Sequence, residues 1–194
     1  MDSKLNFNVH INSICKKAHS TRQFLQRTLS RCDTRAKAQA YTTFVRPIVE
    51  YSASVWDPHR RSQDSARLLE SVQNKAARFA CADWRWTSSV GAMRRRLGWD
   101  TLQERRARAR LIMFHRITNS LVAIPVSFFP CNSSATMTTR GAPNKFLLPH
   151  GSRAYQNSFV CAAPSMWNSL PANIAVITDP EAFCRSISAI GLTA

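Results

Sequence analysis

The chain has 194 residues, 44% of them hydrophobic and 20% charged, so it is long enough to bury a sizeable core and is not a disordered protein. Lys and Arg number 27 against 11 Asp and Glu, which gives a formal net charge of +16. The excess is uneven, with +6 over residues 1–40, +8 over residues 41–120 and +2 over residues 121–194. Because a positive field concentrates polyanions, nucleic acid is the first partner to expect; a basic chain without a specific partner is the alternative.

An amphipathic helix is predicted over residues 9–30, where apolar residues recur among lysines and arginines. Asp33 and Thr34 can cap a second helix, in which apolar residues recur at helical spacing. Pro47 should kink this helix or end its first half, because proline lacks a backbone donor and its ring clashes with the preceding turn. Residues 56–58 then close the element.

Three more helices are predicted before residue 120. Either Ser62 or Asp64 can cap the third, which carries a clear apolar stripe. Residues 87–89 start a short fourth helix that ends at Gly98. A fifth helix should follow the capping-box sequence of residues 101–104, in which a Thr hydroxyl and a Glu carboxylate each satisfy a free backbone amide, and should reach about Asn119.

The composition changes after Pro125, where prolines arrive among Ser, Thr, Gly and Asn and helical periodicity is lost. Asp179, followed by Pro180, can open one last short helix. We therefore predict a mainly α fold. Residues 1–124 should form a basic helical bundle, and residues 125–194 an irregular Pro/Ser-rich C-terminal extension with a short terminal helix.

No catalytic constellation is visible in the sequence. Polymerase chemistry needs clustered carboxylates that hold two divalent ions, and the acidic residues here are dispersed. The sequence also has no Gly-rich phosphate loop, no Gly-x-Ser-x-Gly and no His-Glu-x-x-His. We expect no enzymatic activity and no cofactor. The five histidines lack ligand spacing and are interpreted as core or surface residues: His10, His19, His59, His115 and His150.

The six cysteines also lack the spacing of a zinc site, so no metal is expected. Cys15, Cys32, Cys81 and Cys184 lie among apolar positions of predicted helices, where a free cysteine behaves as a small hydrophobe. This pattern indicates a reducing compartment. With no signal-like start and no apolar run of membrane-spanning length, we expect an intracellular protein, nuclear or cytoplasmic.

Arginines and aromatic residues interleave between residues 78 and 110. Guanidinium groups bind phosphates bidentately and stack on bases, so this pattern is typical of a groove that follows a nucleic-acid backbone. Alternatively, Trp84, Trp86 and Trp99 anchor the core while the arginines cover apolar surface. We favour the core interpretation for the tryptophans and leave both open for the arginines. The candidate nucleic-acid contacts are Lys16, Lys17, Arg22, Lys75, Arg78, Arg94, Arg95, Arg96, Arg105 and Arg106.

Five stretches of the sequence resemble one protein family. Residues 40–51 read AYTTFVRPIVEY and residues 55–58 read VWDP. This stretch resembles the LVRPxLEYAxxVWxP signature that follows the palm in jockey-like non-LTR retrotransposon reverse transcriptases. Four further stretches resemble the family in the same order: residues 2–11 (DSKLNFNVHI), 69–79 (LESVQNKAARF), 97–106 (LGWDTLQERR) and 167–171 (WNSLP).

The resemblance implies the thumb and the following region of an RNA-directed DNA polymerase, a part that closes over the primer–template duplex. Residues 1–124 would be the thumb-like domain, and the palm with its aspartates would lie before residue 1. We therefore expect a non-catalytic piece that grips RNA template or RNA–DNA hybrid by backbone contacts and can join a palm. The alternative is a structural remnant or protein-interaction fragment of a truncated element.

Overall fold

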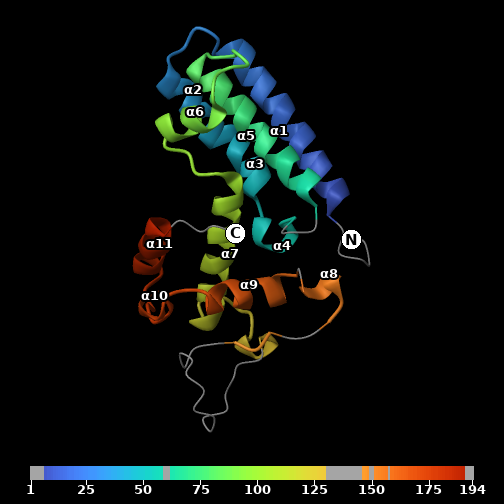
Figure 1. Ribbon diagram of the computed structural model, residues 1–194, viewed down its shortest axis with the longest axis vertical. Helices are drawn as coiled ribbons and strands as arrows, with labels where there is room; N and C mark the ends of the chain where they lie inside the picture. The colour runs from blue at the N-terminus through green and yellow to red at the C-terminus, as the bar shows by residue number, and fades with distance from the viewer. Residues whose placement is uncertain (1–6, 59–61, 130–145, 149–150, 157, 191–194) are drawn as a thin grey trace. The chain divides into compact units, whose positions relative to one another are not determined.

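The computed structural model describes residues 7–58, 62–129, 146–148, 151–156 and 158–190. Over these residues the fold is mainly helical and contains no strand, which confirms the predicted fold class (Figure 1). The chain divides into two compact units, Met1–Arg105 and Arg106–Ala194, called unit 1 and unit 2 below. Two of the histidines named above, His59 and His150, and one of the six cysteines, Cys131, lie outside the described residues.

Unit 1 is a helical bundle in which α1 and α5 point in the same direction (Figure 1). Their first turns are joined by the Ser65 hydroxyl, which donates to the Asn8 side chain over 3.0 Å. The segment α2–η1–α3 runs the opposite way, so that Lys37 near its start lies 5.5 Å from the ring of Phe79 near the end of α5. The helices of unit 1 are α1 (Asn8–Thr28), α2 (Thr34–Ala40), the π-helix η1 (Tyr41–Val45), α3 (Arg46–Glu50), α4 (Ala53–Trp56), α5 (Gln63–Cys81) and α6 (Val90–Arg96).

The predicted caps start the helices of unit 1. Asp33 accepts from the amide of Ala36, and Ser62, rather than Asp64, accepts from the amide of Ser65. The predicted start of the fourth helix is also correct, since Ser89 caps α6, and the turn at Gly98 has a left-handed φ of 66°. Each cap satisfies an amide that would otherwise lack a partner.

Pro47 does not end the second helix, contrary to one of the two predicted outcomes. The π-helix η1 lies directly before it, and the amide of Arg46 bonds to the carbonyl of Tyr41 five residues back. The wider π turn gives room where the proline ring would clash with the previous turn of an α-helix. The helix therefore continues to Glu50.

The core of unit 1 is formed by one face each of α1, η1–α3 and α5. Cys15 is buried there, as predicted, whereas Cys32 is exposed after the end of α1, so its predicted packing is wrong. The buried core residues include Ile11, Ala18, Leu25, Val45, Val49, Trp56, Leu69, Val72, Ala76, Phe79 and Leu102.

Unit 2 is more helical than the sequence predicted. The helix α9 contains Pro164 and is apolar on most sides, which is why no amphipathic period marks it in the sequence. The terminal helix α11 begins as predicted, with Asp179 accepting from the amide of Ala182. The helices here are α8 (Arg153–Gln156), α9 (Phe159–Asn168), α10 (Ala172–Ala175), α11 (Pro180–Ala189) and the 3₁₀ turn η2 (Val126–Phe128).

The helix α7 (Leu102–Thr118) begins in unit 1 and continues in unit 2. Its start is the predicted capping box: the amide of Thr101 donates to Glu104 over 2.8 Å, and the amide of Glu104 donates to the Thr101 hydroxyl over 3.0 Å. Three apolar residues from its later turns lie in the core of unit 2: Leu111, Phe114 and Ile117. The units therefore divide between Arg105 and Arg106, whereas the change in composition had placed the boundary after residue 124.

Candidate nucleic-acid interface

Arg105 is held inside unit 1 by Glu50. Its Nε and a terminal nitrogen donate to the two carboxylate oxygens of Glu50, the latter bond measuring 3.0 Å. Arg46 lies 3.7 Å from the same carboxylate. This hydrogen bonding raises the pKa of Arg105, and burial, followed by the charge of Glu50, raises the pKa of the neighbouring Tyr41. Arg105 thus joins the start of α7 to α3 and is not free to contact phosphate.

Arg94 is held in a similar way by Glu70 on α5. Arg94 donates to one carboxylate oxygen over 3.3 Å, and the backbone amide of Gln103 donates to the other over 2.8 Å. Both charged side chains are about one-fifth exposed, at 21% and 20%. One carboxylate therefore ties α5 to α6 and to the first turn of α7, and it uses an arginine that the sequence assigned to nucleic acid.

Two further candidates are buried. Arg22 is 7% exposed and donates to Gln26 over 2.7 Å, and its burial lowers its pKa. Arg106 is 1% exposed and belongs to unit 2. A buried side chain cannot reach a phosphate without a rearrangement, and a paired one would first have to leave its carboxylate, so we remove the buried Arg22 and Arg106 and the paired Arg94 and Arg105 from the candidate surface.

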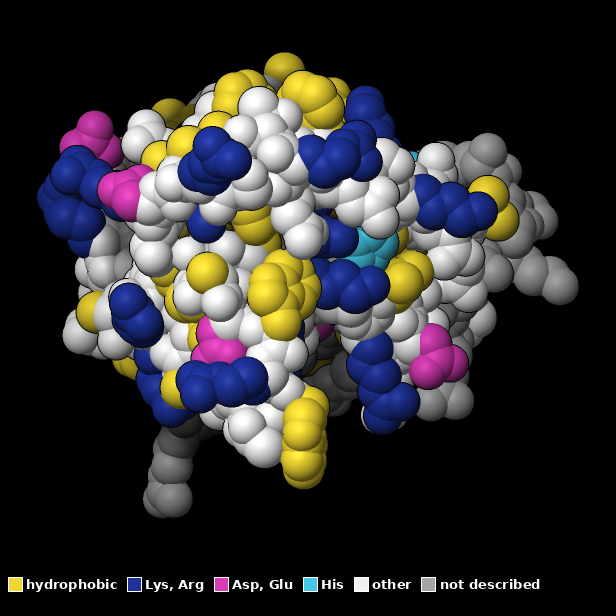
Figure 2. All heavy atoms as spheres, turned by 90° about the horizontal axis from the view of Figure 1, so that it is seen from above, with side chains coloured by type: hydrophobic (Ala, Val, Ile, Leu, Met, Phe, Trp, Pro, Cys, Tyr) yellow, Lys and Arg dark blue, Asp and Glu magenta, His cyan; other side chains and the backbone are white. Residues whose placement is uncertain are grey.

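Five of the ten candidates remain exposed: Lys16 and Lys17 on α1, Lys75 on α5, and Arg95 and Arg96 on α6. Lys75 lies on α5, the helix that packs on α1. Burial, with smaller effects from the charges of Lys75 and Arg22, lowers the pKa of His19 on α1. Arg95 and Arg96 are in the last turn of α6, which packs on α5. Seen from the end of unit 1 that carries α2 and α6, Lys and Arg side chains lie among exposed hydrophobic ones (Figure 2).

The remaining candidate, Arg78, organises the segment Ala82–Ser89 between α5 and α6, called the tryptophan loop below. Arg78 donates to three of its carbonyl oxygens, those of Asp83 at 3.4 Å, Arg85 at 2.8 Å and Ser88 at 3.3 Å. Asp83 in turn accepts from Nε and a terminal nitrogen of Arg85, each over 3.2 Å. These hydrogen bonds hold the pKa of Asp83 well below its usual range.

A hollow of about 790 Å³ lies between this loop and α6. Its lining includes Trp84, Arg85, Ser88, Met93 and Arg96. It therefore combines an aromatic ring, two guanidinium groups and a hydroxyl, which suits an anionic ligand with flat apolar parts.

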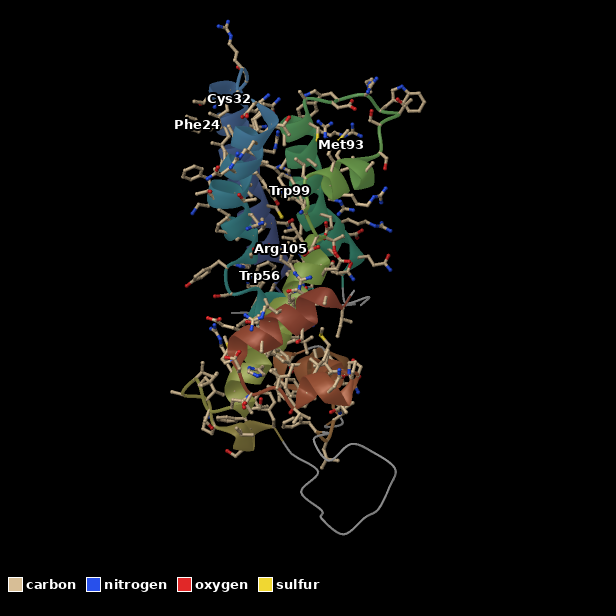
Figure 3. All side chains as sticks on the ribbon, turned by 90° about the vertical axis from the view of Figure 1, so that its left-hand side faces the viewer. Phe24, Cys32, Trp56, Met93, Trp99 and Arg105 are labelled. Carbon is tan, nitrogen blue, oxygen red and sulfur yellow. The ribbon has the colours of Figure 1, made fainter. Side chains whose placement is uncertain are left out.

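The three tryptophans of this region have different environments. Trp99 packs on Tyr41 with ring centroids 4.5 Å apart, which confirms the predicted core role, and it lies among the helices together with Arg105 (Figure 3). Trp84 is 52% exposed and Trp86 is 91% exposed, so the core interpretation is wrong for both. The sequence did contain a signal that Trp84 and Trp86 are exposed, because no apolar period connects them to the stripe of α5.

The described residues contain no group of three or more His, Cys, Asp or Glu side chains that could hold a metal ion. No helix in this part of the chain is both long and apolar enough to span a membrane. His115 lies in the core of unit 2, where its Nε2 is 2.8 Å from the carbonyl oxygen of Ile177 and its ring stacks on Phe183. Comparison of the chain with protein-family models, curated proteins and solved structures gave no match.

Proposed function

We propose that this chain is a non-catalytic nucleic-acid-binding module that grips the phosphate backbone of RNA or an RNA–DNA hybrid through unit 1. The observation that carries the proposal is the exposed pair Arg95 and Arg96 at the end of α6, next to the hollow that Arg85 and Arg96 line. Arginines at such a place bind phosphates without reading bases, so we expect little sequence preference.

The resemblance to the post-palm region of jockey-like reverse transcriptases is consistent with this role. In that setting unit 1 would act as the thumb, and its partner would be a palm supplied by the rest of the polymerase. The proposal assigns no chemical step to the chain itself.

A second function is supported by the arginines that pair within the protein. Glu50 and Glu70 hold Arg105 and Arg94, as expected of a structural remnant or protein-interaction fragment in which basic residues stabilise the fold. In that case the remaining exposed arginines would be a solvated surface, favoured at the end of α6 by the helix dipole.

The salt dependence of binding separates the two functions. The measured quantity is the affinity for a labelled RNA hairpin and for an RNA–DNA hybrid over a series of salt concentrations. For a variant with Arg95→Gln and Arg96→Gln, we expect weaker binding to both probes. We also expect the slope of log affinity against log salt to flatten by roughly 0.7–0.9 per lost phosphate contact.

The chain offers a control with the same loss of charge. Arg67 and Arg185 are exposed and pair at 3.8 Å with Asp64 and Glu181, away from the tryptophan loop in sequence. The double variant Arg67→Gln, Arg185→Gln should leave the slope nearly unchanged if binding is local to α6. If both double variants shift the slope equally, or if the unmodified chain binds neither probe, the module function is wrong and the remnant interpretation stands.

A further inference from the structure

The tryptophan loop, residues 82–89, exposes two large aromatic rings close together in sequence. Indole rings are usually buried for most of their surface, yet Trp86 is 91% exposed and Trp84 is 52% exposed. The two are separated only by Arg85, and Trp84 and Arg85 both line the hollow beside α6. A scattered exposed apolar residue needs no explanation, but a pair of rings with arginines indicates a binding surface.

The loop that carries these rings is held in place. Arg78 donates to three of its carbonyl oxygens, and the positive φ of 50° at Ala82 turns the chain out of α5. The side chain of Asp83 accepts from the backbone amide of Arg85 over 3.1 Å as well as from its guanidinium. Because the loop backbone is already ordered, binding a ligand on the rings costs the loop little conformational entropy.

The charges around the rings favour an anionic ligand. Arg85 and Arg96 line the hollow, and Arg95 is exposed next to Arg96 on α6. The one carboxylate in the lining, Asp83, is paired with Arg85, so these two charges largely offset each other and the net positive charge beside the rings comes from Arg95 and Arg96. Flat rings flanked by guanidinium groups are the arrangement that binds single-stranded nucleic acid, because every base has a face that can stack.

We propose that the tryptophan loop is a stacking platform for unpaired bases, so that unit 1 binds a single-stranded segment of RNA or DNA in addition to a duplex backbone. This inference rests on the proposed function, since the arginines of α6 hold the phosphates of the same strand. Bases inside a duplex are stacked on one another and cannot reach the rings. The platform therefore selects overhangs, loops and free strands.

The test compares two probes of the same sequence, a single-stranded RNA and its blunt duplex. The variant replaces both rings by leucine, Trp84→Leu and Trp86→Leu, which keeps apolar bulk and removes the aromatic face. We expect the affinity for the single strand to fall about tenfold or more, and the affinity for the duplex to change less than about twofold. In the unmodified chain, the single strand should quench tryptophan fluorescence more strongly than the duplex.

A matched control removes two exposed rings elsewhere on unit 1. Phe24 on α1 and Phe44 on η1 are each 58% exposed, and the double variant Phe24→Leu, Phe44→Leu should bind both probes as the unmodified chain does. Trp84→Phe with Trp86→Phe should retain much of the single-strand affinity, since a ring remains. Far-UV circular dichroism checks that each variant is folded.

The outcomes distinguish this inference from the function on which it rests. If the leucine variant binds the single strand as well as before, while the variant of Arg95 and Arg96 loses affinity for both probes, the stacking platform is wrong and the backbone-binding function survives. An equal loss for strand and duplex also overturns the platform. If the unmodified chain binds neither probe, both proposals fail and the rings belong to a protein-binding surface.

Discussion

Aromatic rings in unit 2 pack together in its core: Phe114 meets Trp167 edge-on with ring centroids 5.4 Å apart, and Phe183 stacks on Trp167 with centroids 5.6 Å apart. In unit 1, Trp99 is used in the same way, but Trp84 and Trp86 are left at the surface on a loop that Arg78 holds. Leaving these two rings exposed gives up the favourable burial that Trp167 and Phe183 gain in the core of unit 2. This difference is the basis on which we place the proposed binding surface on unit 1.

Arginines show a related contrast. In unit 1, Arg105 and Arg94 pair with the carboxylates of Glu50 and Glu70, whereas Arg95 and Arg96 at the end of α6 are exposed. In unit 2, Arg106 and Arg110 are almost fully buried, and Arg110 lies 3.3 Å from the sulfur of Met166. Which arginines of a sequence cluster are structural and which lie at the surface can therefore be told only from their three-dimensional neighbours.

The largest expected effect tests the contrast between buried and exposed rings. Trp167→Ala removes a 4% exposed ring from the core of unit 2 and should destabilise that unit by about 3–5 kcal/mol. Trp86→Ala should change stability by less than about 0.5 kcal/mol, because its ring is almost fully exposed. Urea unfolding followed by circular dichroism measures both. A loss of more than about 2 kcal/mol for Trp86→Ala would show that the ring has a structural role after all.

The next effect tests whether Arg105 is structural. Replacing Glu50 by Gln, Arg105 by Gln, and both together forms a double-mutant cycle for a bidentate ion pair whose side chains are 23% and 29% exposed. After allowance for solvent screening, we expect a coupling energy of about 1–2 kcal/mol. The same cycle on the exposed pair Arg185 and Glu181 should give less than about 0.5 kcal/mol. Equal coupling energies in the two cycles would mean that partial burial does not strengthen the pair of Glu50 and Arg105.

The helices of unit 1 could be predicted from the sequence because each signal is local. Asp33, Ser62 and the capping box of residues 101–104 each stand directly before an apolar stripe, and caps and stripes act within one or two turns. The helix α9 was missed because it lies in an apolar environment and contains Pro164, so neither the period nor the propensity indicates a helix.

The candidate site could be predicted only in part, since its composition depends on contacts between distant residues. Glu50 and Arg105 are 55 positions apart, and Glu70 and Arg94 are 24 apart. No pattern in the sequence connects these pairs, so the sequence could not separate paired arginines from exposed ones. Trp84 and Trp86 differ, because the lack of an apolar period around them was a signal in the sequence against a core role.

The smallest effect concerns His19 at the contact between α1 and α5. Burial, together with the charges of Lys75 and Arg22, lowers its pKa below the ordinary value of 6.5. As the pH falls below about 6.5, the unfolded chain takes up a proton at this residue before the folded chain does, so stability decreases until the pH passes the pKa of the folded state. Above about pH 6.5 His19 contributes no pH dependence.

The measurement is the urea midpoint of unit 1 at about pH 7.5 and about pH 5.5. The replacement His19→Gln should reduce the loss of stability between these two values, because Gln cannot be protonated in this range. Lys75→Gln should reduce it less, since it removes only the positive neighbour and leaves the burial. If Lys75→Gln has as large an effect as His19→Gln, the charge of Lys75 and not burial is the main cause of the lowered pKa. In that case a phosphate bound at Lys75 would screen its charge and raise the pKa of His19. The bundle would then lose less stability as the pH falls.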